Sequence, residues 1–215
     1  VIAGWTVAYI WVMGFGDVGQ DAQEIGAYFE GFTANGPLSL SLTFGFLALT
    51  AVCILGGVRA GIERVTKTLM PLLFGLLVIL AIRAFTLPGA AQGLTYYLQP
   101  DFSKIADINV LTAALGQAFF SLSLGMGALI TYGSYMSRQH NLGVSALWVV
   151  LLDTMIALLA GFIIFPTGFS VEGFDPSASG PGLIFHVLPQ LFGTLPGGQL
   201  FGTAFFILLT IAALT

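Results

Sequence analysis

Polar and glycine residues interrupt a strongly apolar stretch from Leu115 to Tyr135, at Ser121, Ser123, Gly125 and Gly127. Serine and glycine at the centre of an apolar segment weaken a helix there. Backbone groups freed at mid-bilayer are tolerated only where they are buried in protein or line a polar cavity. The ends of half-helices in such a break can bind ions and charged groups of a solute. The stretch therefore predicts a broken membrane helix whose break forms a ligand site.

Gln117 precedes Ser121 by one helical turn, and Phe120 lies beside them. A polar pair on one helix face indicates a lined cavity. The alternative is that glutamine and serine hydrogen-bond across a helix interface, as they do in many membrane bundles. The pair alone leaves both interpretations open, and the adjacent serines and glycines favour the cavity.

Asp153 is the tenth residue of the apolar run from Val144 to Phe165, which contains no lysine or arginine. A carboxylate within a bilayer costs at least about 2.5 kcal/mol, so its default interpretation is an ion or proton site. A protonated aspartic acid hydrogen-bonded within the bundle is the alternative. This carboxylate, the Ser121 hydroxyl and the freed carbonyl groups are hard oxygen donors, which suit a small hard cation. We expect that cation to be sodium.

The composition excludes an ordinary soluble domain. Of the 215 residues, 57% are hydrophobic and 7% are charged, whereas soluble domains carry roughly 25% charged residues, and the mean hydropathy is +0.96. A full crossing needs about 20 residues, which gives four full or nearly full spans and two partial ones. The apolar runs are Val1–Met13, Leu38–Leu55, Met70–Leu87, Val110–Tyr135, Val144–Phe165 and Leu200–Leu214. The sequence predicts an all-α, multi-pass integral membrane protein, and because both ends lie in apolar runs we expect it to be a piece of a longer chain.

The basic residues indicate the orientation. Arg59, Arg64 and Lys67 lie between the second and third runs, and Arg138 lies between the fourth and fifth. Basic loops stay in the cytoplasm, so the remaining, mostly acidic loops face outward. Arg83 lies near the outer end of the third run, where its guanidinium can reach the interface. The net charge of −4 mostly reflects the outer loops and gives no indication of a nucleic-acid partner.

The outer loop from about residue 167 to 198 is long for a connector, and it contains four of the nine prolines. Within it, the apolar stretch Gly182–Phe192 predicts a short helix over the mouth of the cavity. Long ordered loops of this kind can act as lids. We refer to residues 167–198 as the lid loop.

Other chemistry is poorly supported. His140 and His186 fall on opposite sides of the predicted membrane, so they cannot share a metal ion. Gly14–Asp17 matches the GxGD string of intramembrane aspartyl proteases, which need a second aspartate to share a proton, and no Tyr-Asp string occurs. We therefore do not expect an enzyme.

The segment 116–125, GQAFFSLSLG, resembles the sixth transmembrane helix of the neurotransmitter:sodium symporter family, in particular its bacterial amino-acid transporters. Weaker matches run along the rest of the chain, at Gly4–Thr6, Asp153–Gly161, Gly180–Leu183 and Ala212–Thr215. The resemblance implies a leucine-transporter-type inverted-repeat bundle with broken helices. Residues 1–215 then form part of one transmembrane transporter domain, from late in the third helix to early in the eighth.

The resemblance also implies roles for individual residues. One sodium site would use Ser121 and Asp153, and a second would use the Ala212 carbonyl together with Thr215. Gln117 and Asp153 correspond to the anion site of chloride-dependent relatives. The substrate pocket would be lined by Phe120, Ser121, Ser123 and Met126.

Two departures from the family pattern are informative. Many relatives have asparagine where this chain has Asp153, and chloride-dependent animal members have serine where it has Ala157. A carboxylate at Asp153 can supply the negative charge that chloride supplies elsewhere, so we predict no chloride requirement. Met126 stands where several relatives have phenylalanine, and a flexible methionine adapts to larger side chains, which favours a bulky hydrophobic or aromatic substrate.

The sequence thus predicts sodium-coupled symport of an amino acid into the cell by alternating access in the cell membrane. The expected partners are the amino acid and the lipid bilayer, and the sequence indicates no oligomeric state. A channel or a non-transporting receptor built on the same helices is the alternative function.

Overall fold

The computed structural model describes the chain except residues 17–21, 56–62, 137–140, 171–173, 177–181 and 215. The described residues form helices and no strand, which confirms the all-α prediction. The elements are α1 (Ile2–Phe15), α2 (Ala22–Ala34), α3 (Gly36–Leu55), α4 (Glu63–Ala84), α5 (Ala90–Leu98), the 3-10 turn η2 (Phe102–Lys104), α6 (Ile108–Ser121), α7 (Ala128–Tyr135), α8 (Leu142–Gly168), α9 (Gly182–Gly193) and α10 (Gly198–Leu214).

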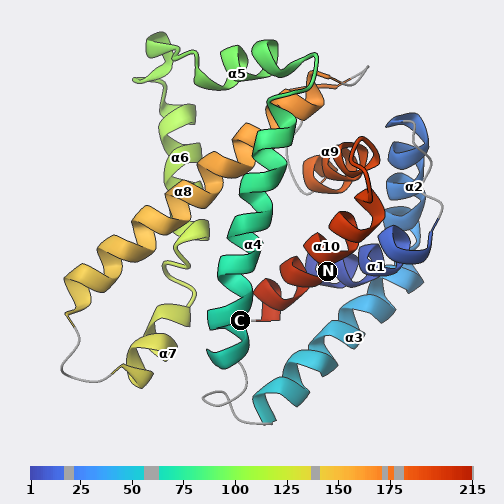
Figure 1. Ribbon diagram of the computed structural model, residues 1–215. Coiled ribbons are helices and arrows are strands. Elements are labelled where there is room, and N and C mark those ends of the chain that lie inside the picture. The colour runs from blue at the N-terminus through green and yellow to red at the C-terminus, as the bar shows by residue number, and fades with distance from the viewer. Residues whose placement is uncertain (17–21, 56–62, 137–140, 171–173, 177–181, 215) are drawn as a thin grey trace. The chain divides into compact units, whose positions relative to one another are not determined.

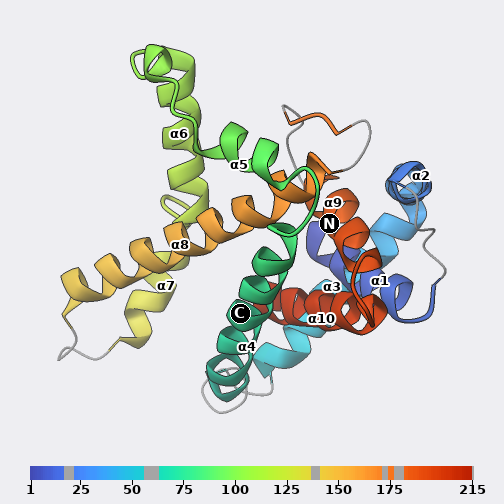
Figure 2. The same cartoon turned by 45° about the horizontal axis from the view of Figure 1, so that its top comes forward.

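Internal contacts divide the chain into two compact units, which are described separately here. The first unit comprises residues 1–97 and 161–215, and the second comprises residues 98–160. In the first unit, α10 contacts α1, α4 and α9, and both views show these helices together (Figure 1 and Figure 2). The second unit contains η2, α6, α7 and the part of α8 that precedes Gly161.

The helices follow the predicted apolar runs. Two of them are long and apolar enough to cross a membrane by length and composition, namely the Gly36–Cys53 part of α3 and the whole of α8. Helix α4 has 22 residues and contains Pro71 in its interior. The short helix predicted in the lid loop is present as α9.

Helices α1 and α10 pack antiparallel through small side chains. Met13 lies against Gly202, where an added Cβ would approach the methionine methyl group to 2.9 Å. Further along, the Thr210 hydroxyl donates a hydrogen bond of 2.9 Å to the Thr6 hydroxyl, which in turn donates to the carbonyl of Ala3 at 2.7 Å. The residue with the higher number in α1 thus meets the residue with the lower number in α10, which shows that the two helices run antiparallel. Both threonines are buried, so the pair satisfies polar groups inside the bundle.

Helix α2 was not predicted, because its segment was interpreted as an acidic outer connection. It lies within that segment and contacts α9 and α3. Ile25 and Phe32 are buried on one face, while Glu24 and Glu30 are exposed on the other. The helix therefore forms because its apolar residues recur at helical spacing and cover the neighbouring helices.

An aromatic cluster holds α9 in the first unit. Phe185 of α9 is 1% exposed, and its ring lies 4.8 Å from that of Tyr9 on α1. It stacks on Phe29 of α2 at 5.4 Å and on Phe206 of α10 at 5.8 Å. Ring pairs at these separations add to the stabilisation that comes from buried area. The helix predicted to cover the cavity mouth is thus packed against three others.

Helix α5, also not predicted, packs on the C-terminal end of α8. Gly93 allows this close approach, since a Cβ at that position would lie 2.5 Å from the Phe165 carbonyl oxygen. Tyr97 stacks on the ring of Phe165 at 5.0 Å. The connection after α4 is therefore fixed to the first unit rather than extended.

Candidate functional site: a broken helix and an intramembrane carboxylate

Helix α6 has a defined start and a defined end. Its N-cap is Asp107, whose carboxylate accepts a hydrogen bond of 2.9 Å from the backbone N–H of Asn109, as N-cap residues do. The helix ends at Ser121, and the backbone N–H of Leu122 donates to the carbonyls of Ala118 and Phe120. Residues 122–127 then separate α6 from α7 (Figure 1). The predicted break is therefore present.

The backbone in the break is turned by residues in the left-handed region. Gly125 and Gly127 both have φ +78°, and Ser123 has φ +54°. Glycine adopts this conformation without strain, whereas a serine there is uncommon and marks a constrained position. Ser123 is the only non-glycine residue with positive φ among those the structure describes. Strain of this kind is concentrated in functional sites.

The break leaves backbone groups available. Within the described chain, the N–H groups of residues 125–129 and the carbonyls of residues 121–126 form no backbone hydrogen bond. The carbonyls continue from the C-terminal end of α6, and the N–H groups lead into the N-terminal end of α7. Cations are favoured at helix C-termini and anions at N-termini. The break thus offers oxygen donors for a cation next to N–H donors for an anion.

The structure brings Ser121 and Asp153 together. The Ser121 hydroxyl donates to Asp153 Oδ2 at 2.5 Å, joining the end of α6 to α8. Both residues belong to the second unit. A hydroxyl bonded to a carboxylate makes a short, strong hydrogen bond, and the serine oxygen keeps lone pairs for a further partner. Two oxygen atoms are thereby held side by side in the form that a hard cation binds.

The other residues predicted for the substrate pocket flank the break. The side chains of Phe120 and Met126 are 72% and 59% exposed, so the described residues do not enclose them. Gln117, one turn before Ser121, is also exposed, and its side chain has no hydrogen bond in the described part of the chain. These residues surround the break, and any closed pocket requires further groups.

The structure does not test the residues predicted for a second sodium site. Ala212 lies near the end of α10, in the first unit. Thr215 lies outside the described residues. The second site therefore stays a prediction.

Histidine and acidic residues form no metal cluster among the described residues. His186 on α9 packs its ring edge-on against Phe29 at 4.9 Å, and its Nε2 is buried and has no hydrogen-bond partner among the described residues. Burial lowers the pKa of His186, and the nearby Glu30 partly opposes this. His140 and Asp17, the latter from the protease-like string, lie outside the described residues.

Sequence reasoning missed one contact near the lid loop. Arg83 was expected to reach the membrane interface, which the structure does not test, and its guanidinium donates to the carbonyl of Thr194, just after α9. No pattern within the α4 sequence indicates this partner, which is 111 residues away. Only the three-dimensional arrangement of α4 and the turn after α9 shows it.

The sequence of the chain is similar to those of known sodium-dependent transporters. The model of the "Sodium:neurotransmitter symporter family" matches residues 17–215. The chain is 41% identical over 216 residues to the uncharacterized sodium-dependent transporter YhdH of Bacillus subtilis, and 42% identical over 220 residues to an uncharacterized sodium-dependent transporter of Haemophilus influenzae. Each alignment covers 100% of this chain and 47% or 48% of the relative. The chain thus spans about half the length of these relatives.

A solved structure and an animal relative extend the comparison. The crystal structure of MhsT in complex with L-phenylalanine matches with a TM-score of 0.91 and 48% identity, covering 99% of this chain and 48% of that one. The bovine "Sodium- and chloride-dependent creatine transporter 1" is 33% identical over 198 residues, which cover 86% of this chain and 30% of the relative.

Proposed function

The chain belongs to the sodium:neurotransmitter symporter family, and we propose that the full-length protein uses sodium entry to drive uptake of an amino acid. The family and the named relatives are integral membrane transporters, so the chain is part of a transporter and not an enzyme. The steps below are the mechanism that this proposal entails.

The observation that carries the proposal is the hydrogen bond between Ser121 and Asp153. It holds a hydroxyl and a carboxylate together at the point where α6 ends, next to the Ser121 carbonyl, which accepts no backbone hydrogen bond within the described chain. Sodium is a small hard cation that is bound by such oxygen atoms. In our proposal these groups form one sodium site, and the Ala212 carbonyl and Thr215 contribute to a second.

The break also supports binding of a zwitterionic solute. The N–H groups at the start of α7 favour a carboxylate, and the adjacent Phe120 and Met126 present apolar surface. MhsT, whose crystal structure contains L-phenylalanine, is 48% identical to this chain. We therefore propose a bulky hydrophobic or aromatic amino acid as the substrate, bound by Phe120, Ser121, Ser123 and Met126.

Chloride independence is part of the proposal. The bovine relative is named as chloride-dependent, and the family resemblance gives such members serine at the position of Ala157. Here Asp153 provides a fixed negative charge beside the proposed sodium site. A fixed charge removes the need for a bound anion, because it already balances the cation. Gln117 would then be a remnant of the anion site.

Alternating access would connect these sites to transport. The end of α6 and Asp153 would coordinate the same sodium ion, and the amino acid would then bind. The lid loop would close before the site opens inward. The oxygen and N–H groups need not move far in this scheme. The alternative is a channel or non-transporting receptor, which would lack saturable, sodium-driven accumulation.

Uptake by the purified full-length protein in proteoliposomes tests the proposal. Radiolabelled tryptophan, leucine and glycine are offered with sodium or choline outside, and with chloride or gluconate as the anion. Saturable uptake above equilibrium that requires sodium and ignores chloride is the expected result. Uptake of every amino acid at the same rate in choline would refute sodium coupling, and flux without saturation would favour the channel.

A further inference from the structure

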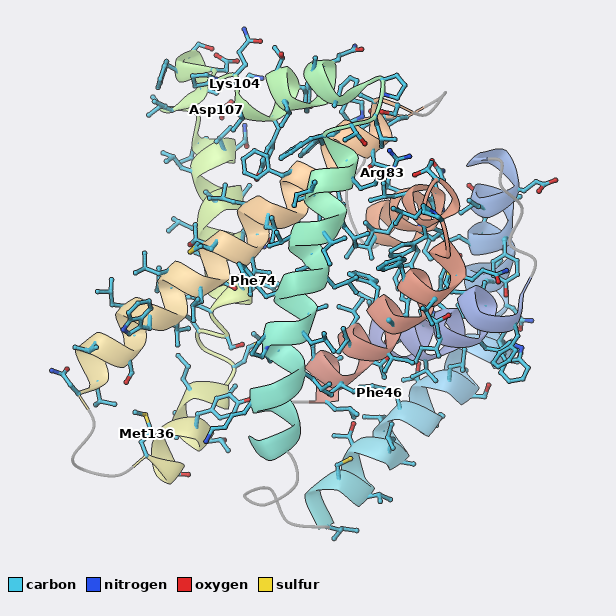
Figure 3. The ribbon with its side chains drawn as sticks, in the orientation of Figure 1. Phe46, Phe74, Arg83, Lys104, Asp107 and Met136 are labelled. Atoms are coloured by element: carbon cyan, nitrogen blue, oxygen red, sulfur yellow. The ribbon has the colours of Figure 1, made fainter. Side chains whose placement is uncertain are left out.

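A hydrogen bond between two buried hydroxyl groups joins α1 to α10. The Thr210 hydroxyl donates to the Thr6 hydroxyl at 2.9 Å, and the Thr6 hydroxyl donates to the Ala3 carbonyl at 2.7 Å. Thr6 is 3% exposed and Thr210 is 6% exposed. The two helices contact one another, and side chains of both lie between their ribbons (Figure 3). The bond therefore crosses a packed interface within the first unit.

Thr210 uses its hydroxyl differently from other helical threonines. Thr43 on α3 and Thr203 on α10 each donate to a carbonyl one turn earlier in their own helix, both at 2.7 Å. Such a carbonyl is within reach of a threonine in any helix. The Thr210 hydroxyl bonds across the interface although its own helix offers this alternative. The bond is thus a property of this position and not of threonine in a helix.

The contacts between α1 and α10 share one antiparallel register. The matching pairs are Thr6 with Thr210, Tyr9 with Phe206, and Met13 with Gly202. Each step of three or four residues along α1 is matched by a step of four residues back along α10. A shift of α10 by one residue would move it about 1.5 Å along its axis and turn it by about 100°. Such a shift separates the two hydroxyls, so their bond favours this register over its neighbours.

Ala212 follows Thr210 by two residues on α10, and we propose its carbonyl as a ligand of the second sodium ion. Two residues of an α-helix correspond to a rise of about 3 Å and a turn of about 200°. Because Thr210 faces α1, Ala212 lies on the opposite side of the helix, at nearly the same height. The position in which Thr210 is held therefore determines where the Ala212 carbonyl lies.

We propose that Thr210 is a positioning residue for the second sodium site and acts through its bond to Thr6. The bond fixes the height and the rotation of α10 against α1, and with them the place of the Ala212 carbonyl. Metal ligands must lie within about 0.2 Å of their proper distance, so a small displacement of α10 weakens binding of the ion. This inference rests on the proposed function, because it requires the second sodium site.

The sodium dependence of uptake by the full-length protein in proteoliposomes tests the inference. Thr210→Val keeps the shape of the side chain and removes the hydroxyl. Sodium must then select the correct position of α10 from a wider set, so the sodium concentration for half-maximal uptake should rise. We expect a rise of about three- to tenfold, the range for loss of a hydrogen bond between membrane helices.

The maximal rate of uptake distinguishes positioning from a merely structural role. Saturating sodium restores the position of α10, so Thr210→Val should reach the same maximal rate per folded transporter as the unchanged protein. A lower maximal rate at an unchanged sodium concentration for half-maximal uptake would overturn the inference. Thr210→Ser retains the hydroxyl and should restore most of the sodium affinity.

Two further variants test whether the bond itself is responsible. Thr203→Val is the matched control, because that hydroxyl donates within α10 to the Gln199 carbonyl, and it should leave the sodium dependence unchanged. Thr6→Val removes the acceptor, and adding it to Thr210→Val should cause no further rise, because both substitutions break one bond. Effects of Thr6→Val and Thr210→Val that multiply would refute a shared bond.

Thr6→Val is also the milder variant if Thr210→Val does not fold. The Thr210 hydroxyl can then donate to the Phe206 carbonyl of its own helix, so no buried donor is left without a partner. The sodium concentration for half-maximal uptake should still rise, because the bond between the helices is lost. An unchanged value in Thr6→Val would refute the positioning role.

Sodium binding measured without transport assigns the effect to the second site. Binding of radioactive sodium to the purified protein in lipid nanodiscs is compared between Ser121→Ala and the double variant Ser121→Ala with Thr210→Val. Because Ser121→Ala weakens the first proposed site, the remaining affinity reports the second. That affinity should fall by about three- to tenfold in the double variant. Equal affinities in the two proteins would overturn the inference.

The unchanged protein separates this inference from the proposed function. Uptake by the unchanged protein that does not depend on sodium would mean that the proposed function has failed. If that uptake does depend on sodium, and Thr210→Val and Thr6→Val show the same dependence, only the inference has failed.

Discussion

Replacing Asp153 with asparagine separates the charge of this side chain from its shape. Asparagine is nearly isosteric, and its carbonyl oxygen can still accept the hydrogen bond that the Ser121 hydroxyl donates at 2.5 Å. The oxygen beside the proposed sodium site is therefore kept while its negative charge is removed. We expect sodium-dependent uptake by Asp153→Asn to acquire a chloride requirement.

The size of the effect follows from the charge that is lost. Two unit charges about 4 Å apart at an effective dielectric constant of about 20 attract by about 4 kcal/mol. Each 1.36 kcal/mol corresponds to a factor of ten, so the apparent sodium affinity without chloride should fall by roughly 100- to 1000-fold. Part of the hydrogen-bond strength is lost as well, since the acceptor is no longer charged. A bound chloride ion would restore the balance of charge.

The assay is the initial rate of uptake against sodium concentration, in proteoliposomes with chloride or gluconate. Asp153→Glu is the matched control, because it keeps the charge and should remain indifferent to chloride. Adding Ala157→Ser to Asp153→Asn should lower the chloride concentration needed, because the serine offers a donor for the anion. Equal rates for Asp153→Asn in chloride and gluconate would show that the carboxylate does not replace an anion.

Three further perturbations test the site and the lid. Ser121→Ala should raise the sodium concentration for half-maximal uptake by about tenfold, because a hydrogen bond to a charged group is lost; an unchanged sodium dependence would remove this hydroxyl from the site. Gly125→Ala places a Cβ on a residue in the left-handed region at φ +78°, so it should lower the free energy of unfolding by about 1–2 kcal/mol, measured as a fall in melting temperature. Gly116→Ala, inside α6, is the control and should be neutral or stabilising. Equal effects of the two substitutions would refute backbone strain at Gly125. Burial lowers the pKa of His186, so packing of α9 should be fully stable above the ordinary histidine pKa of about 6.5 and weaken as the pH falls below it. Hydrogen exchange of α9 should therefore be faster at about pH 5.5 than at about pH 7.5, on either side of that value. His186→Gln should abolish this difference.

The break in the fourth apolar run could be predicted because its residues are unusual for a spanning helix. Serine and glycine at alternating positions remove both the apolar surface and the helix propensity that lipid favours. The exact turn could not be predicted, since it depends on Ser123 adopting φ +54°, which serine rarely does. The bond between Ser121 and Asp153 was expected as a shared site and is present as a direct contact.

Two helices were missed because their segments look like polar connections. In α2, the spacing of Ile25, Phe29 and Phe32 at intervals of four and three residues does carry an amphipathic signal. Glycines and acidic residues in the same segment obscured it. In α5, the buried face consists of Ala90 and Gly93, which are too small to produce an apolar pattern. That helix is specified by close approach to α8, which sequence periodicity does not reveal.

The proposed site residues differ in how they are held by the described chain. The proposed sodium ligands Ser121 and Asp153 come from helices within one unit, so local sequence and packing position them. Phe120 and Met126, which we propose to line the substrate pocket, are exposed among the described residues.

The hydroxyl pair between α1 and α10 also bears on the order in which the protein is assembled. Thr6 and Thr210 are 204 residues apart, so α1 must wait in the bilayer until nearly all of the chain described here has been synthesised. While it waits, the Thr6 hydroxyl can donate to the Ala3 carbonyl of its own helix, and no donor is left unsatisfied in lipid. When α10 arrives, the Thr6 oxygen accepts the Thr210 hydroxyl without giving up that bond. The Thr6 hydroxyl can therefore be satisfied within α1 before α10 is made, and it can still accept the hydrogen bond from Thr210 afterwards.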